Sequence, residues 1–165
     1  MSSVSYDPVK AHEYYEKHKK LKGRHSTKGF SDTQKEQWAY AKAQLSDQYK
    51  AKKKDISETA KTDTKELSEL AKEKKKELSD QTKEKVDELR AQLKSLPKEQ
   101  KAAMREKIND AIGALKDKLK TAKQNISDIQ TAKKGEIKDT KTAANAQAKA
   151  NYESELDKAH ARIKG

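Results

Sequence analysis

Cysteine is absent from this chain of 165 residues, and proline, glycine and aromatic residues are scarce. Without cysteine there can be no disulfide framework and no thiolate metal site. One tryptophan, one phenylalanine and a hydrophobic fraction of 32% exclude a large globular core. No apolar run approaches the length that crosses a membrane, and the first residues lack the apolar stretch of a secretory signal. We therefore expect a soluble, intracellular protein.

Charged residues make up 40% of the chain, with 39 Lys and Arg against 27 Asp and Glu, so the formal net charge is +12. Because acids and bases are interleaved, the pattern is typical of solvated helix faces with Glu and Lys pairs. The basic surplus also leaves open an association with nucleic acid, although the interleaved acids interrupt any continuous phosphate track. Steep salt dependence of binding would favour the nucleic-acid interpretation.

An eleven-residue repeat runs from Leu45 to Glu99, with lysine at every sixth position and an acidic residue at every last one. The first positions are all large aliphatics: Leu45, Ile56, Leu67, Leu78 and Leu89. Eleven residues make three helical turns of about 3.67 residues each, so the repeat draws a nearly straight apolar stripe along a long helix. Smaller residues at the fifth position, such as Ala60, Ala71 and Thr82, form a second stripe.

A separate segment precedes the repeats. Asp7 and Pro8 provide a standard helix start, and Gly23 a standard helix stop, so we expect a short helix over residues 8–22. The following stretch, GRHSTKGFSD, is rich in loop-forming residues. Residues 1–30 are therefore predicted to form an N-terminal docking segment, distinct from residues 31–165.

The rest of the chain is predicted to form a long helical hairpin. Ser31 and Gln34 make a capping box for a helix that continues to Leu96, where Pro97 ends it. An arm of similar length follows, so the fold class is all-α: a short helix and then an elongated antiparallel hairpin or coiled coil, with its turn near residues 96–99. The alternative is a single long rod kinked at Pro97.

The two arms can be aligned about the turn so that paired residue numbers sum to 193. The pairs are Leu89 with Met104, Leu78 with Leu115, Leu67 with Ile126, Ile56 with Ile137, Leu45 with Ala148, and Ala41 with Tyr152. This seam is thin, so apolar burial offsets little of the entropy lost on ordering the arms. We therefore expect self-association or assembly with a partner, and Gly135 is the expected weak point of the second arm.

Catalytic and metal-binding patterns are lacking. His12 and Glu13 begin like the helical zinc motif, which needs a second histidine where this chain has Glu16. His18 and His25 add metal-ligating groups nearby, but on a charge-rich helix such groups are expected to face solvent. There is no phosphate-cradling glycine loop and no nucleophile elbow. We expect a protein that is not an enzyme and holds no cofactor or metal.

Repeats such as ISETAKTDTKE and TKTAANAQAKA resemble those of late embryogenesis abundant proteins and other amphipathic desiccation helices. That resemblance covers residues 45–165 and implies a chain that is disordered in dilute buffer and folds on drying or on membranes. The large aliphatic first positions and the symmetry about Pro97 depart from the desiccation pattern and favour a real helix–helix seam. Binding to a membrane surface would need a wider apolar face.

The stretch YDPVKAHEYYEKHKKLKGRHSTKGFSDTQKE, residues 6–36, resembles the opening of small basic helical proteins encoded among the structural genes of tailed bacteriophages of Gram-positive hosts. In that family a DP-x-KAHEYY motif leads through KLKGR to a long charged helix. The resemblance implies a scaffolding-like or capsid-associated protein, present in the host cytoplasm during assembly and in the virion. Its partners would be capsid or portal proteins or further copies of itself.

Aromatic and arginine side chains carry much of the binding energy at protein interfaces, so the densest group of them marks the expected contact surface. The residues predicted to bind the partner are Tyr14, Tyr15, His18, Lys19, Lys20, Leu21, Lys22 and Arg24. The alternative is that the aromatic residues of this segment pack against Trp38 and Tyr40.

Overall fold

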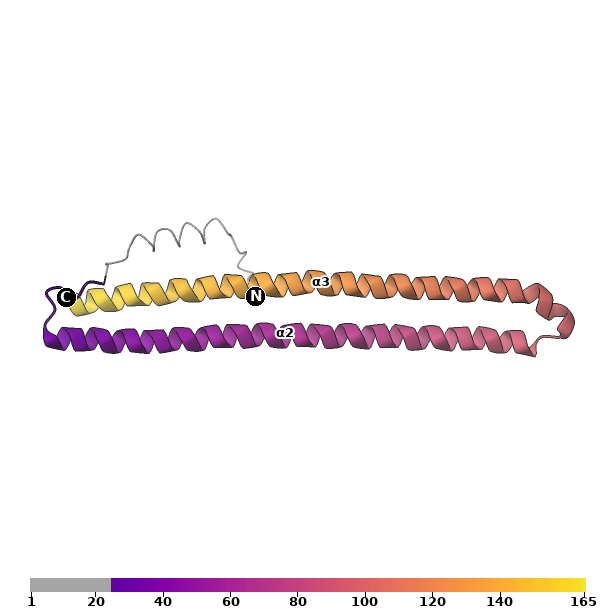
Figure 1. Cartoon of the computed structure of the whole chain (residues 1–165), viewed down its shortest axis with the longest axis horizontal. Helices are drawn as coiled ribbons and strands as arrows, with labels where there is room; N and C mark the ends of the chain where they lie inside the picture. The colour runs from indigo at the N-terminus through magenta and orange to yellow at the C-terminus, as the bar shows by residue number, and fades with distance from the viewer. Residues whose placement is uncertain (1–24) are drawn as a thin grey trace. The chain divides into compact units, whose positions relative to one another are not determined.

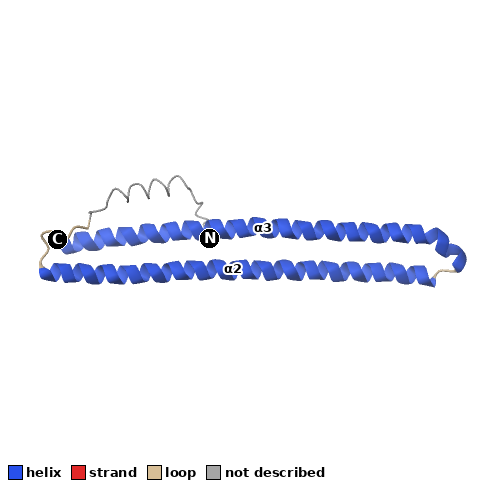
Figure 2. Cartoon of the chain, viewed as in Figure 1, coloured by secondary structure: helices blue, strands red, loops and turns tan. Residues whose placement is uncertain are grey.

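The computed structural model describes residues 25–165, and helices account for nearly all of this range. Helix α2 spans Asp32–Ser95 and helix α3 spans Lys98–Lys164. Loops precede α2 and join it to α3, and the described part of the chain contains no strand (Figure 1, Figure 2). The predicted all-α fold with a helical hairpin is confirmed. The short helix predicted over residues 8–22 lies outside the described residues.

Both helices pass through two compact units. Of the described residues, unit 1 combines those up to Thr62 with α3 from Glu136 onward, and unit 2 is Asp63–Gly135. Within each unit the α2 segment packs antiparallel against the α3 segment (Figure 1). Gly135, the expected weak point, is the last residue of unit 2, and α3 remains helical through it. The division predicted at residue 30 stays a prediction, because most of the docking segment lies outside the described range.

The predicted capping box starts α2. The Ser31 N–H donates to Gln34 Oε1 at 2.8 Å, and the Gln34 N–H donates to Ser31 Oγ at 3.2 Å. The Ser31 carbonyl accepts the first helical hydrogen bond, from the Lys35 N–H at 2.9 Å. Two backbone donors that a helix start would otherwise leave without a partner are thereby satisfied.

Leu96 and Pro97 form the turn in unit 2, inside the range predicted for it. Proline has no N–H and cannot continue α2. Its carbonyl accepts hydrogen bonds from Gln100 N at 2.9 Å and Lys101 N at 3.1 Å, which starts α3. The alternative of one rod kinked at Pro97 is wrong, because α2 ends here and α3 returns beside it (Figure 1).

In the two repeats that begin at Leu67 and Leu78, the first, second, fifth and ninth positions are withdrawn from solvent. In the repeat that begins at Leu67, the residues withdrawn from solvent are Leu67, Ser68, Ala71 and Lys75. At about 98° per residue the first, fifth and ninth positions fall within one narrow arc. The predicted stripes of first and fifth positions are confirmed. The ninth position was missed because its chemistry varies, from lysine at Lys75 to valine at Val86.

The apolar core of unit 2 lies near the turn. Val86, Ile108 and Ile112 are buried. The aliphatic cluster consists of these three residues and the partly buried side chains packed on them: Val86, Leu89, Leu93, Ile108, Ile112 and Leu115. Burial of such side chains is the main source of stability for paired amphipathic helices.

Other parts of the unit 2 seam are polar. Lys75 Nζ donates to Ser127 Oγ at 2.7 Å, and Gln130 Nε2 donates to Ser68 Oγ at 3.3 Å. Each bond pairs groups that the seam partly removes from water, and each joins α2 to α3. The net stabilisation from such bonds is modest, about 0.5–1.5 kcal/mol each, but leaving one partner unsatisfied costs more. These contacts therefore select one alignment of the two helices.

The alignment differs from the predicted one. Lys75 contacts Ser127, nine positions further along α3 than the predicted pairing places its partner. In unit 1, Tyr152 stacks on Tyr49 and not on Ala41. The predicted register was wrong by five to nine residues at the cross-helix contacts that fix it.

The short turn explains the shift in register. Packed helix axes lie about 8–10 Å apart, and the two residues between α2 and α3 do not by themselves carry the chain across. The first turns of α3 cross instead, as Figure 1 shows beside the turn. Met104, predicted to face Leu89, is 37% exposed. Because residues at the start of α3 are used for the crossing, the paired positions move further along α3.

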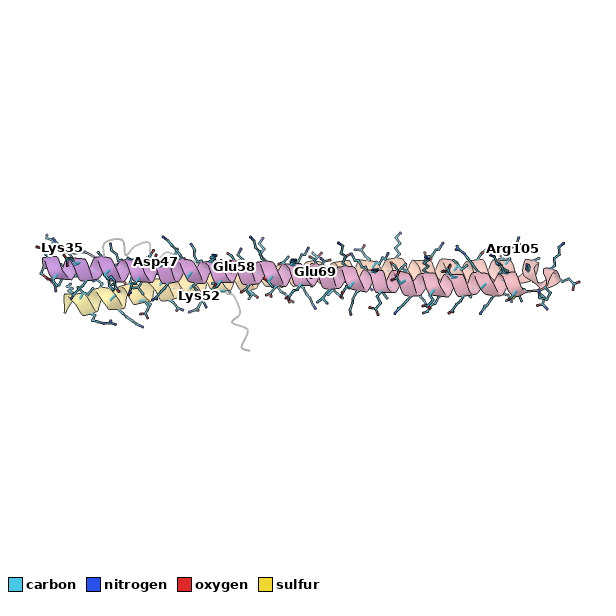
Figure 3. The ribbon with its side chains drawn as sticks, turned by 90° about the horizontal axis from the view of Figure 1, so that it is seen from below. Lys35, Asp47, Lys52, Glu58, Glu69 and Arg105 are labelled. Atoms are coloured by element: carbon cyan, nitrogen blue, oxygen red, sulfur yellow. The ribbon has the colours of Figure 1, made fainter. Side chains whose placement is uncertain are left out.

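Charged side chains cover the outward sides of both helices. In unit 1 the labelled Lys35, Asp47 and Glu58 are exposed, and in unit 2 the same holds for Glu69 and Arg105 (Figure 3). Exposed ion pairs on a helix contribute only about 0.3–0.5 kcal/mol each. The charged coat therefore keeps the helices hydrated and adds little to their stability.

Candidate functional site

The eight residues predicted to bind a partner all lie outside the described residues, so their role stays a prediction. They are Tyr14, Tyr15, His18, Lys19, Lys20, Leu21, Lys22 and Arg24. The described chain begins with the next residue, His25. The loop over residues 25–31 is therefore the part of the candidate site that shows how the docking segment is attached.

Four rings meet in unit 1, where this loop reaches α3. Trp38 lies edge-on to His160 with ring centroids 5.2 Å apart, and His25 lies 5.3 Å from each of these two rings. Phe30 also lies 5.3 Å from His160. We call His25, Phe30, Trp38 and His160 the aromatic cluster. Trp38 is only 3% exposed and His160 only 8%, so the cluster forms a buried centre.

Two polar contacts bind the loop to α3. His25 Nε2 donates to Asp157 Oδ1 at 2.6 Å, in a partly buried ion pair or hydrogen bond according to the charge of the ring. His160 Nε2 donates to the Ser26 carbonyl at 2.9 Å, since a carbonyl oxygen can only accept. Both histidines therefore carry a hydrogen on Nε2 in these contacts. Each of them joins the loop to the last turns of α3.

The loop itself has a defined shape. The Phe30 N–H donates to the Thr27 carbonyl at 3.0 Å, which closes a turn around Gly29. Gly29 has φ +85, a left-handed conformation that favours glycine. Beyond the turn, Gln34 Nε2 donates to the Ile163 carbonyl at 2.9 Å, so the capping residue of α2 also satisfies a carbonyl at the end of α3.

A second feature of unit 1 is a pair of stacked tyrosines. The rings of Tyr49 and Tyr152 are nearly parallel, at 5°, with centroids 4.7 Å apart. Lys53 Nζ lies 4.9 Å from the Tyr49 centroid, within range of a cation–π contact. A groove of about 440 Å³ runs beside the stack, lined by aliphatic and polar side chains including Leu45 and Ala148.

The structure gives Trp38 and Tyr40 different roles. Trp38 makes ring contacts with the two histidines of the aromatic cluster and is buried, whereas Tyr40 is 67% exposed. The sequence interpretation missed His160, because an apolar pattern was followed along α3 and histidine does not belong to it. The available signal was spacing, since His160 follows Tyr152 by eight residues and thus lies near the same face.

The arrangement is suited to holding a loop in place. Among residues 25–165, no three histidine, aspartate or glutamate side chains gather closely enough to hold a metal ion. Nor does any helix in this range combine the length and apolarity needed to cross a bilayer. The contacts that the structure shows at this site are ring packing and hydrogen bonds between the loop and the last turns of α3.

Comparison of the chain with family models, with curated proteins and with solved structures found no match in any of the three. The phage resemblance of residues 6–36 therefore rests on the sequence motif alone. Function has to be inferred from the residues of this chain.

Proposed function

We propose that this chain is a non-enzymatic structural or assembly protein of a tailed bacteriophage. Its scaffolding-like or capsid-associated role would be exerted in the host cytoplasm during assembly and in the virion. The docking segment, residues 1–30, binds a capsid or portal protein, and the helical hairpin displays that segment. The sequence motif of residues 6–36 is the reason for naming a phage.

The observation that supports docking through this segment is its attachment. The aromatic cluster and the contacts to Asp157 and Ile163 hold the loop at residues 25–31 against the last turns of α3. The chain that directly follows residue 24 is thus held in a fixed position. A binding segment that starts from a fixed point loses less conformational entropy on binding than one at the end of a long free linker. The cluster therefore fits a role in presenting the segment.

The charged coat supports the same proposal. The outward sides of α2 and α3 carry Lys, Glu and Asp side chains that are exposed along both units (Figure 3). Protein interfaces are depleted in Lys and Glu and enriched in Tyr, Trp and Arg. By composition, Tyr14, Tyr15 and Arg24 are better contact residues than most of the described surface.

The direct test is co-sedimentation of the purified full-length chain with the capsid and portal proteins encoded in the same phage genome. A Tyr14→Ala, Tyr15→Ala double variant should lose most of the binding. Tyr40→Ala is the matched control, because Tyr40 is an exposed tyrosine outside the segment. No binding by the unmodified chain to either protein, or equal binding by the double variant, would contradict the proposal.

A nucleic-acid-associated role is the second candidate, and the net charge of +12 favours it. Binding of this kind weakens steeply with salt, because each neutralised phosphate releases counterions. Replacing Lys19, Lys20 and Lys22 by glutamine should then weaken binding to duplex DNA of any sequence. A protein partner held by Tyr14 and Tyr15 predicts little effect of salt and a large effect of the tyrosine substitutions.

A further inference from the structure

In unit 1, α3 has a second face that is withdrawn from solvent. Ala148 is buried on the side that faces α2, and Tyr152, one turn further along, stacks on Tyr49. Ala146 and Ala150 lie two residues before and after Ala148, which is about 200° around the helix, so both point away from α2. Each of these two alanines is nevertheless only partly exposed.

The part of α3 in unit 2 provides the comparison. Gln130 faces α2 there, since its Nε2 donates to Ser68 Oγ. Asp128 and Ala132 lie two residues before and after Gln130, and both are exposed. An alanine on the side of α3 turned away from α2 is thus exposed in unit 2 and partly covered in unit 1. The residue type is the same, so the difference lies in what is packed against it.

The partly covered residues of unit 1 recur at alternating steps of three and four, which is the spacing of a face on which another helix packs. They are Ala143, Ala146, Ala150, Glu153 and Asp157, and we call them the outer face of α3. Residues 25–165 contain no helix other than α2 and α3, and α2 lies on the other side. The covering element has to be sought in the docking segment.

The docking segment has the length and the starting point that this requires. His25 Nε2 donates to Asp157 Oδ1, so the chain before His25 starts from one end of the outer face. The range 143–157 and the helix predicted over residues 8–22 both contain 15 residues, or about 22 Å of helix. Laid along α3 in the same direction, the predicted helix would cover the outer face from end to end.

The apolar side chains of the two surfaces are complementary in size. Along the helix predicted over residues 8–22, Ala11, Tyr14, His18 and Leu21 also follow one another at steps of three and four. Tyr14 and Leu21 are large, whereas the outer face offers alanine at three of its five positions. Large side chains opposite small ones allow two helices to pack closely.

The charges are complementary as well. The basic side chains of the segment gather at its C-terminal end, next to the starting point at Asp157: Lys19, Lys20, Lys22 and Arg24. The outer face carries its two acids, Glu153 and Asp157, at this same end and alanines at the other. Attraction between opposite charges therefore favours the direction that the chain connection already imposes.

We propose that residues 8–22 pack as a helix on the outer face of α3, parallel to α3. Tyr14 and Leu21 lie in the contact, and the basic end of the segment lies over Glu153 and Asp157. Tyr15 is turned about 100° from Tyr14 around the predicted helix, so it stays at the edge of the contact. The contact is made within one chain and does not rest on the proposed phage function.

The absence of cysteine from the natural chain allows single thiols to report on chosen positions. The experiment compares the rates at which a maleimide modifies Ala146→Cys and Ala132→Cys in the full-length chain. Ala146→Cys should react at least several-fold more slowly in buffer, and the two variants should react alike in urea. Far-UV circular dichroism verifies that both stay helical in buffer. Equal rates in the folded chains would overturn the proposal.

Substitutions in the segment identify what covers the outer face. Adding Tyr14→Asp and Leu21→Asp should raise the rate of Ala146→Cys to that of Ala132→Cys. Glu16→Gln is the matched control, because Glu16 lies on the opposite side of the predicted helix, and it should leave the slow rate unchanged. A slow rate that persists with both aspartates would overturn the proposal.

Dilution separates the proposal from self-association. Protection of Ala146→Cys by its own chain should not depend on protein concentration. A rate that rises on dilution would overturn the proposal, because a second copy would then cover the outer face. No capsid or portal protein takes part in these measurements, so their failure is distinguishable from a failure of the proposed function.

Discussion

Units 1 and 2 are built around different kinds of side chain. In unit 2 the buried centre is the aliphatic cluster, in which Val86, Ile108 and Ile112 touch without a polar group among them. In unit 1 the buried centre is the aromatic cluster, in which Trp38 packs against two histidines that also make hydrogen bonds. The buried centre is therefore held by non-directional packing alone in unit 2, whereas in unit 1 its residues also make directional contacts.

The difference follows from what each unit has to hold. Unit 2 closes on its own turn, where two helices are joined by two residues and chain connectivity already limits their separation. Unit 1 contains the loop before α2 and the last turn of α3, which lie more than a hundred residues apart in the chain. Joining them depends on non-covalent contacts, each of which uses at least one side chain. Hydrogen bonds fix the position of a loop more specifically than aliphatic contacts do.

The largest expected effect is that of Trp38→Ala. Truncating a buried tryptophan typically costs about 3–5 kcal/mol, because contacts are lost and a cavity remains. Trp38 touches both histidines of the aromatic cluster, so its loss should also loosen the loop. Urea unfolding followed by far-UV circular dichroism measures the change. Tyr40→Ala should stay within about 0.5 kcal/mol of the parent, and equal effects of the two substitutions would show that the aromatic cluster is not a buried centre.

The corresponding substitution in unit 2 is Ile112→Ala. We expect a loss of about 2–3 kcal/mol, at the low end for a buried isoleucine because only a few side chains surround it. The control is Ile129→Ala, which alters the same residue type at a position that is 56% exposed. The expected change there is within about 0.5 kcal/mol. A loss at Ile129 as large as that at Ile112 would mean that α3 is paired in another register.

Removal of the capping box should have a smaller effect. Ser31→Ala deletes the oxygen that accepts from the Gln34 N–H, at an expected cost of about 1 kcal/mol. Ser31→Asp keeps an acceptor at the same position and should recover most of that loss. Ser154→Ala, in an exposed part of α3, should be neutral or slightly stabilising by helix propensity. A neutral Ser31→Ala, measured by thermal unfolding, would show that the start of α2 is held by the aromatic cluster alone.

The fold could be predicted because its determinants are local. The eleven-residue period depends only on the order of residues along one helix, and Ser31 with Gln34 forms a cap within one turn. Pro97 ends α2 for a reason internal to the residue. Such local features can be read directly from the sequence. The period, the cap and the end of α2 at Pro97 all appear in the structure.

The register and the aromatic cluster could not be predicted in the same way. The register depends on how many residues of α3 are used to cross from one helix to the other, which is a three-dimensional quantity. The contact between His25 and Asp157 joins positions 132 residues apart. No local pattern indicates that these two residues make a contact. In a charge-rich chain, a histidine or an aspartate is expected to face solvent.

The smallest expected effects are those of the two glycines in unit 2, and glycine substitutions should differ in sign between the two units. Gly113 and Gly135 belong to unit 2, lie within α3, and have open space where a methyl group would be added. Alanine at either position should raise the free energy of unfolding by about 0.5–1 kcal/mol, because glycine loses more backbone freedom on folding. Gly29 in unit 1 also has open space, but its φ of +85 is unfavourable for alanine.

Gly29→Ala should therefore destabilise the loop by about 1–2 kcal/mol, although no atom obstructs the added methyl group. Thermal unfolding of the three single variants measures the contrast, and the emission of Trp38 shows whether the Gly29 variant also disturbs the aromatic cluster. A stabilising Gly29→Ala would mean that the loop does not hold its left-handed turn in solution. The contacts of His25 and Ser26 with α3 would then have to form without it, since both residues lie just before that turn in the chain.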